Sequence, residues 1–106
     1  MMKEIDFSNA ILIHLETLPN QSLTIRLANS RYEIKLITIS DSLMAITISR
    51  DDVVLIQNKR LIPSVSLLAQ HNAKGHGNFV FITPDETYPY YTEFNNGHEL
   101  YFIPEG

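Results

Sequence analysis

The sequence predicts an all-β domain over residues 1–106, either a small antiparallel β-barrel or a compact sandwich of about seven or eight short strands. Apolar residues recur at every second position through much of the chain, which is the period of a strand with one buried face. Turn-forming residues interrupt these runs about every ten residues, and the five prolines lie near the ends of the runs. A length of 106 residues with 44% hydrophobic residues suits a single domain with one core.

The N-terminal stretch, residues 1–17, contains one short strand-like run. Ile11, Ile13 and Leu15 recur there at every second position. We therefore expect a first strand or an extension ahead of the main series of strands.

Two longer runs form the clearest pattern in the chain. In residues 22–27 and 31–36, apolar side chains alternate with Ser, Thr, Arg, Glu and Lys, so each run has one inward and one solvated face. The apolar positions are Leu23, Ile25, Leu27, Tyr32, Ile34 and Leu36. Only Ala28-Asn29-Ser30 separates the runs, and Asn29 tolerates a left-handed backbone. The runs are therefore predicted to pair as a tight antiparallel hairpin.

A meander is expected to continue after this hairpin. Residues 44–49 repeat the alternation and predict a further strand. Asp51-Asp52 is a polar break that we interpret as a turn before the apolar residues 53–56. Asn58-Lys59 is a second polar break, which predicts another turn before a separate run at residues 60–62.

The last part of the chain holds two more runs and one long loop. Residues 63–71 have weak helical potential and are expected to be irregular. After the Gly75-His76-Gly77 loop, residues 79–82 form one apolar run, and residues 100–103 form another. Between them, residues 83–97 form a turn-rich loop long enough to carry a function. A closed barrel built from these strands would leave no exposed sheet edge.

Charge and composition argue against several classes of protein. The net charge is −4, and residues 75–106 carry five acids but no Lys or Arg, so they repel phosphate and make nucleic acid an unexpected partner. The N-terminus has acids where a signal peptide needs a basic segment. Uninterrupted apolar runs reach four residues, far below the ~18–20 of a membrane helix, so no membrane association is expected. The absence of cysteine excludes disulfides and thiolate metal sites.

No reactive constellation is predicted. The spacing of the four histidines, His14, His71, His76 and His98, matches no metal-ligand motif. No serine lies in a nucleophile elbow, and adjacent residues such as Asp51-Asp52 point to opposite sides of an extended turn. We therefore expect no catalytic residue, cofactor, metal or small-molecule substrate. The alternative is a small hydrolase or metal-dependent enzyme that uses His71, His76 and His98 with Glu99.

Aromatic residues are concentrated in the long loop and in the runs beside it. Eight of the ten lie within residues 79–102. Tyrosine offers a large contact area at a small entropic cost, so a Tyr-rich ordered loop predicts a protein-binding surface. The candidate interface residues are Asp85, Glu86, Tyr88, Tyr90, Tyr91, Glu93 and Phe94. The alternative is that these rings fold back as a lid on the core, and the two roles are compatible.

Four stretches, taken in order, resemble the baseplate plug proteins of contractile-tailed bacteriophages, of the cyanophage type. They are Leu18-Pro19-Asn20-Gln21 ahead of the alternating runs, Arg60-Leu61-Ile62-Pro63 followed by Leu67-Leu68, Gly77-Asn78-Phe79-Val80-Phe81, and Pro89-Tyr90 through Phe94 to Leu100-Tyr101-Phe102. Together they span residues 18–103. The chain departs from the family pattern where Asp51-Asp52 replaces a glycine turn and where Phe94-Asn95-Asn96-Gly97 replaces Phe-Gly.

The resemblance implies a small β-barrel in the central hub of a baseplate, where it would occupy or line the tail channel until the tail fires. The protein would be a structural component of the virion, assembled in the host cytoplasm. Its partners would be hub or spike proteins, or copies of itself. The alternative function is a free-standing cytoplasmic β-barrel module that binds a host or phage protein through the same aromatic loop.

Overall fold

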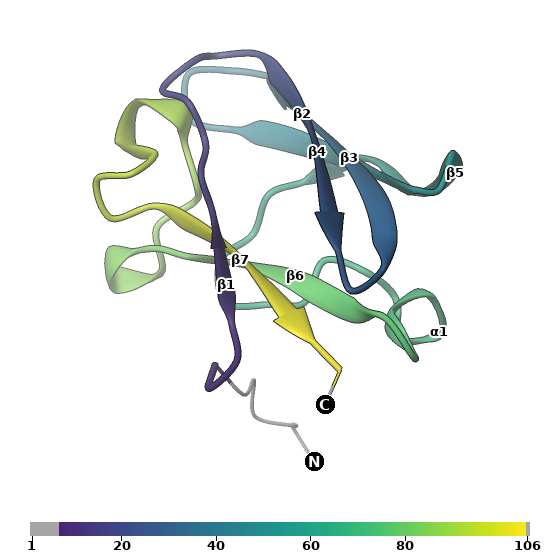
Figure 1. The fold of residues 1–106 in the computed structure, drawn as a ribbon. Helices are drawn as coiled ribbons and strands as arrows, with labels where there is room; N and C mark the ends of the chain where they lie inside the picture. The colour runs from purple at the N-terminus through teal and green to yellow at the C-terminus, as the bar shows by residue number, and fades with distance from the viewer. Residues whose placement is uncertain (1–6, 106) are drawn as a thin grey trace.

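A computed structural model describes residues 7–105 and arranges them as two antiparallel sheets (Figure 1). The four-stranded sheet has the order β2-β3-β4-β5, and its strands are β2 (Gln21–Leu27), β3 (Ser30–Thr38), β4 (Met44–Arg50) and β5 (Val53–Arg60). The three-stranded sheet has the order β1-β7-β6, and its strands are β1 (Ile11–Ile13), β6 (Gly77–Ile82) and β7 (Glu99–Pro104). The predicted all-β class and the predicted number of strands are confirmed.

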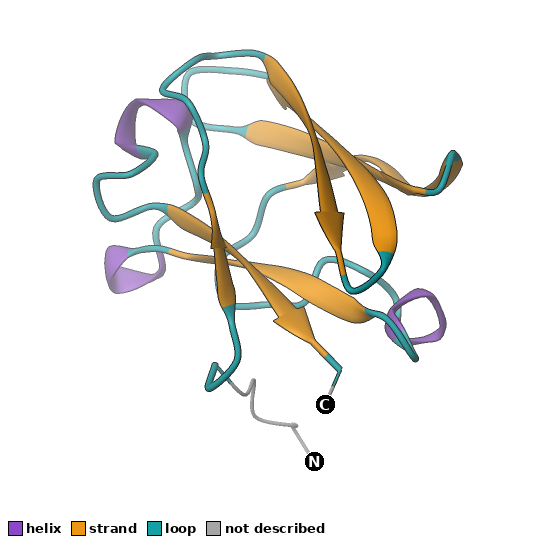
Figure 2. Cartoon of the chain, in the orientation of Figure 1, coloured by secondary structure: helices purple, strands orange, loops and turns teal. Residues whose placement is uncertain are grey.

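Helical structure is minor in the described range (Figure 2). It consists of α1 (Gln70–Ala73) and two 3-10 turns, η1 (Pro84–Glu86) and η2 (Tyr91–Glu93). Within residues 7–105, no helix is long and apolar enough to cross a membrane.

The two sheets do not close into a barrel within residues 7–105. β1 pairs with β7 and β2 pairs with β3, but no ladder joins β1 to β2. No ladder joins β5 to β6 either. Sheet edges therefore remain, which a closed barrel would have removed.

The β2–β3 hairpin is as tight as its sequence predicts. Leu27 pairs with Ser30, which leaves Ala28 and Asn29 as a two-residue turn. Both turn residues have positive φ, 49° and 65°, so the turn has the left-handed geometry whose twist matches that of the flanking strands. The left-handed Asn29 was predicted, whereas the left-handed Ala28 was not, because alanine has no preference for this conformation.

Asp51 and Asp52 form the two-residue turn between β4 and β5. Their φ angles are 50° and 70°, so this turn repeats the geometry of the first hairpin without glycine. A carboxylate oxygen of Asp51 accepts the Arg31 N–H at 2.9 Å, and the Asp51 N–H donates to the Arg31 carbonyl at 2.8 Å. The Arg31 guanidinium also contacts the carboxylate of Asp52. These bonds fix a turn that contains no glycine, and they confirm the interpretation of Asp51-Asp52 as a turn.

The predicted turn at Asn58-Lys59 is wrong, because β5 continues through it to Arg60. Asn58 has φ 50°, and its N–H donates to the Thr47 hydroxyl at 2.9 Å instead of to a main-chain carbonyl. The register between β4 and β5 shifts at this point and again between Ile48 and Ser49. The β-bulges thus keep Asn58 and Lys59 within β5, so residues 60–62 do not form a separate strand.

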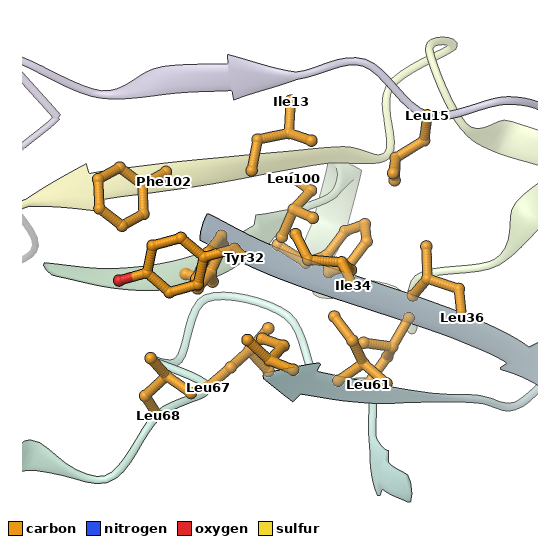
Figure 3. Packing of buried hydrophobic residues seen from close by; sticks show 14 of the residues in the cluster. Ile13, Leu15, Tyr32, Ile34, Leu36, Leu61, Leu67, Leu68, Leu100 and Phe102 are labelled. Atoms are coloured by element: carbon orange, nitrogen blue, oxygen red, sulfur yellow. The ribbon is translucent and has the colours of Figure 1, made fainter. Parts of the chain in front are cut away.

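The core between the sheets is centred on three aromatic rings. The Tyr32 ring of β3 lies 5.1 Å from that of Phe79 on β6 and 5.7 Å from that of Phe102 on β7. The Phe79 and Phe102 rings are 5.1 Å apart. Figure 3 shows Ile13 and Ile34, from opposite sheets, beside this cluster. Each such ring contributes about 2–3 kcal/mol by its burial, so the aromatic cluster joins the two sheets.

The hydroxyl of Tyr32 is buried and has no hydrogen-bond partner within residues 7–105. Burying a hydroxyl without a partner costs about 1–3 kcal/mol. We expect Tyr32→Phe to keep the ring contacts and to leave the free energy of unfolding unchanged or raise it by about 1 kcal/mol. Urea unfolding of the two proteins measures the difference. A loss of stability would mean that the hydroxyl is satisfied in solution.

Residues 63–68 run along the outer edge of β6. The Ser64 N–H donates to the Phe81 carbonyl at 2.8 Å, and the Leu67 N–H donates to the Phe79 carbonyl at 2.9 Å. The segment is irregular, as predicted, but α1 begins at Gln70, inside the stretch of residues 63–71 that was expected to be irregular throughout. These bonds satisfy main-chain groups that the edge of β6 would otherwise leave open.

Candidate protein-interaction surface at the loop end

Three loops leave the strand ends on one side of the molecule, and we call this region the loop end. It comprises residues 14–20 between β1 and β2, residues 39–43 between β3 and β4, and residues 83–97 between β6 and β7 (Figure 1). Antiparallel topology places the C-terminal ends of β1, β3 and β6 beside the N-terminal ends of their partners. The predicted aromatic loop is therefore one of three loops at this end.

Side-chain hydrogen bonds hold the long loop against the two shorter ones. The Tyr90 hydroxyl donates to the Ser40 carbonyl at 3.1 Å. The side-chain amide of Asn95 donates to the Leu15 carbonyl. Desolvation raises the pKa of Tyr90, and the nearby Tyr91 and Asp41 raise it further, so the hydroxyl keeps its proton and remains a donor. The three loops thus form one connected surface.

The long loop is shaped by residues in the left-handed conformation. Asp85 and Glu86 in η1 have φ angles of 52° and 58°, and Asn95 after η2 has 67°. Gly97 has φ 105°, and a Cβ placed there would lie 3.2 Å from Pro84. In this chain, Asn95 and Gly97 therefore supply the tight backbone that follows the aromatic residues.

His98 organises the loop from inside. It is 8% exposed, and its Nδ1 accepts the Tyr90 N–H at 3.0 Å. Its Nε2 lies 3.4 Å from the Thr87 hydroxyl. Because Nδ1 is an acceptor, the neutral ring carries its hydrogen on Nε2. Burial lowers the pKa of His98, although the Glu93 carboxylate opposes this shift.

We expect the fold to lose stability as pH falls below the ordinary histidine pKa of about 6.5. Below that value the unfolded chain binds a proton at His98 that the folded chain resists, because its pKa is lowered in the fold. Thermal unfolding between about pH 5 and pH 7.5 should show a melting temperature that rises with pH. In His98→Gln, whose amide oxygen can accept the Tyr90 N–H, this rise should shrink. An equal rise in both proteins would contradict the assignment to His98.

The aromatic residues of the loop fall into inner and outer groups. Phe94 is 2% exposed, and its ring stacks on Phe81 with 5.8 Å between the centroids. Tyr90 and Tyr91 are half-buried, pack against the core, and lie 4.9 Å from each other. Tyr88 is 48% exposed. The loop is therefore a lid through Phe94, while Tyr88 and parts of the other two tyrosines face solvent.

The loop end is acidic and carries exposed apolar side chains. Its acids are Glu16, Asp41, Asp85, Glu86 and Glu93, and its three loops contain no Lys or Arg. Leu18 is 49% exposed and Ile39 is 57% exposed, in addition to Tyr88. Exposed apolar side chains among charges of one sign are typical of a surface that another protein covers.

The structure divides the predicted interface residues by role. Asp85, Glu86 and Tyr88 lie exposed in and after η1, and the Glu86 carboxylate also accepts the Ser64 hydroxyl at 2.9 Å. The other members, Tyr90, Tyr91, Glu93 and Phe94, lie in and around η2, and only Phe94 among them is fully buried. Whether these residues form an interface stays a prediction.

Sequence reasoning missed the contributions of the two shorter loops. Leu18 and Ile39 lie in turn-rich stretches, out of phase with the strands beside them. That position, an apolar residue just beyond the end of an alternating run, is the signal that could have identified them.

Within residues 7–105, no group of three or more His, Asp or Glu side chains is placed to hold a metal ion. His98 is instead bonded to the main chain of Tyr90, and His71 lies in α1. The described histidines therefore do not gather with carboxylates at one place.

A sequence model of one protein family, described as cyanophage baseplate Pam3 plug gp18, matches residues 10–105. The match covers the four resembling stretches and extends ahead of them to include β1. No curated protein matches the chain significantly.

Proposed function

The chain belongs to the cyanophage baseplate plug family, and from this membership we propose that it sits in the central hub of a phage tail baseplate and acts there by protein–protein packing. Its family is a structural one, so the protein is a component of the virion tail baseplate and interacts with other baseplate proteins. The proposal adds the position in the hub, occlusion of the tail channel until firing, and assembly in the host cytoplasm.

The observation that carries the packing mechanism is the composition of the loop end. Three loops that are distant in sequence are bonded into one surface, with five acids and no Lys or Arg among them. Tyr88, Leu18 and Ile39 supply apolar area on it. A surface of this kind fits a rigid partner that covers the apolar groups and places cations opposite the acids.

The partner that this surface favours is a hub or spike protein whose contact face carries Lys or Arg around an apolar recess. Aromatic and aliphatic anchors contribute most of the binding free energy at such contacts, whereas exposed charges at the rim mainly set orientation and rate of association. We therefore expect Tyr88, rather than the individual acids, to dominate affinity.

Localisation tests the proposal directly. Purified tails are digested and searched for this chain by mass spectrometry, and labelled antibody locates it on intact particles. We expect it in tails, at the baseplate end. Recovery only as free protein from infected cells would overturn the plug proposal and favour a free-standing cytoplasmic binding module.

A substitution pair tests whether the loop end makes the contact. Tyr88→Ala should reduce the copies of the protein per tail several-fold, because an exposed anchor is lost while stability changes by less than about 0.5 kcal/mol. Val54→Ala is the matched control, since Val54 on β5 is 55% exposed but lies outside the loop end. Equal incorporation of both variants would place the contact elsewhere on the protein.

A further inference from the structure

The two sheets present four edges, and three of them carry features that obstruct pairing with another strand. The outer edge of β6 is covered by residues 63–68, and β1 is only three residues long. β5 is interrupted by two register shifts and ends in Lys59 and Arg60. Bulges, lysines, short strands and covering segments are the means by which proteins block unwanted strand pairing.

The fourth edge, β2, has none of these features. Its seven residues pair with β3 in unbroken register from Gln21 to Leu27. It contains no Pro or Gly, and Arg26 is its only charged residue. Within residues 7–105, no strand lies against the outer side of β2.

Hairpin geometry fixes which main-chain groups of β2 face outward. Leu27 and Ser30 close the two-residue turn, so Leu27, Ile25 and Leu23 exchange hydrogen bonds with β3. The N–H and C=O groups of Ser22, Thr24 and Arg26 therefore point away from the sheet. Leu23 and Ile25 are half-buried against the core, which leaves part of each exposed along this edge.

We propose that β2 pairs antiparallel with β2 of a second copy of this chain, about a twofold axis at Thr24, and so forms a continuous eight-stranded sheet. In this register Thr24 faces Thr24 of the second copy, and Ser22 faces its Arg26. All outward groups of the three residues are used, giving six main-chain hydrogen bonds. Among residues 7–105, no other strand pairs with these outward groups.

The side chains of β2 are complementary to those of a second copy in the same register. Leu23 lies opposite Ile25 of the second copy in the closely spaced, non-hydrogen-bonded position, so the half-exposed apolar groups cover one another. The only charged side chain of the strand, Arg26, faces a serine, so no like charges are opposed. A second copy therefore satisfies the edge without any change in β2.

A disulfide trap tests this register, because the chain has no cysteine of its own. In Thr24→Cys the two Cα atoms would lie about 5.5 Å apart, within the range that a disulfide spans. In Ser22→Cys, the matched control, residue 22 is displaced by four positions from its copy, about 14 Å away. We expect Thr24→Cys to form a covalent dimer under mild oxidation at least tenfold faster than Ser22→Cys. Equal rates, or no dimer of either, would overturn the pairing.

A charge pair tests it without covalent chemistry. Thr24→Lys and Thr24→Glu should each be monomeric in sedimentation equilibrium at concentrations where the parent protein dimerises, because like charges meet on the axis. Mixing the two variants should restore a dimer. Ser49→Lys is the control, because Ser49 lies on the same face of the sheet as Thr24 but on the central strand β4, so this variant should dimerise like the parent. A monomeric parent protein, or no recovery on mixing, would reject the proposal. The pairing does not depend on the loop end, so Tyr88→Ala should dimerise normally.

Discussion

Gly77→Ala is expected to destabilise the protein by about 3 kcal/mol or more. A Cβ at this position would lie 2.6 Å from the Phe102 ring and 2.7 Å from the carbonyl oxygen of Ile103. The Ile103 carbonyl belongs to β7, which pairs with β6 at this point, and the Phe102 ring is fully buried against Tyr32 and Phe79, so neither atom can withdraw freely. The φ of 129° adds backbone strain for any residue with a side chain.

Gly75→Ala is the matched control for this experiment. Gly75 also has positive φ, 79°, but nothing lies within 4 Å of the added Cβ. Its substitution should therefore cost only the backbone term, about 1 kcal/mol. Urea unfolding of both variants separates close approach from backbone strain. Similar losses for the two glycines would show that contact with β7 is not what Gly77 provides.

Phe94→Ala is expected to lower the free energy of unfolding by about 3–5 kcal/mol. Phe94 is the buried ring of the aromatic loop and stacks on Phe81 of β6, so its removal leaves a cavity between the loop and the sheet. The loop should also loosen, since Asn95, the next residue, bonds to the Leu15 carbonyl. Thermal or urea unfolding measures the first effect, and hydrogen exchange of the loop amides measures the second.

Tyr88→Ala provides the comparison within the same loop. Its ring is about half exposed and should cost less than about 0.5 kcal/mol of stability. The two substitutions thereby separate the lid role of the loop from its contact role. Full stability in Phe94→Ala would mean that the ring is not part of the core in solution.

The four-stranded sheet could be predicted from sequence because its signals are local. Leu23, Ile25, Tyr32 and Ile34 alternate with polar residues, and Asn29 marks the turn between them. Each strand then pairs with its neighbour along the chain, so periodicity and turn position determine the sheet.

Features that depend on distant or unusual contacts could not be predicted. The polar pair Asn58-Lys59 predicts a turn, yet both residues lie within β5, where the Asn58 N–H donates to the Thr47 hydroxyl. Apolar alternation is the same in a closed barrel and in two separate sheets, so it did not show that β1 and β2 remain unpaired.

The candidate site was predicted in one of its three loops. Clustered tyrosines identify residues 83–97, but composition does not reveal that Phe94 turns inward while Tyr88 remains exposed. Leu18 and Ile39 join the same surface only through the folding of the chain. The sequence does not distinguish His98 from the other three histidines, because its role depends on accepting the Tyr90 N–H in the folded chain.

The pairing of β1 with β7 determines when each part of the protein can form. A ribosome releases β2 to β5 with all their pairing partners while β7 is still unmade. The ladder between β1 and β7 must instead wait until Glu99–Pro104 has been made, and it closes a long loop at an entropic cost. A truncated or stalled chain would thus leave Ile13 and Leu15 uncovered, as a target for chaperones and proteases.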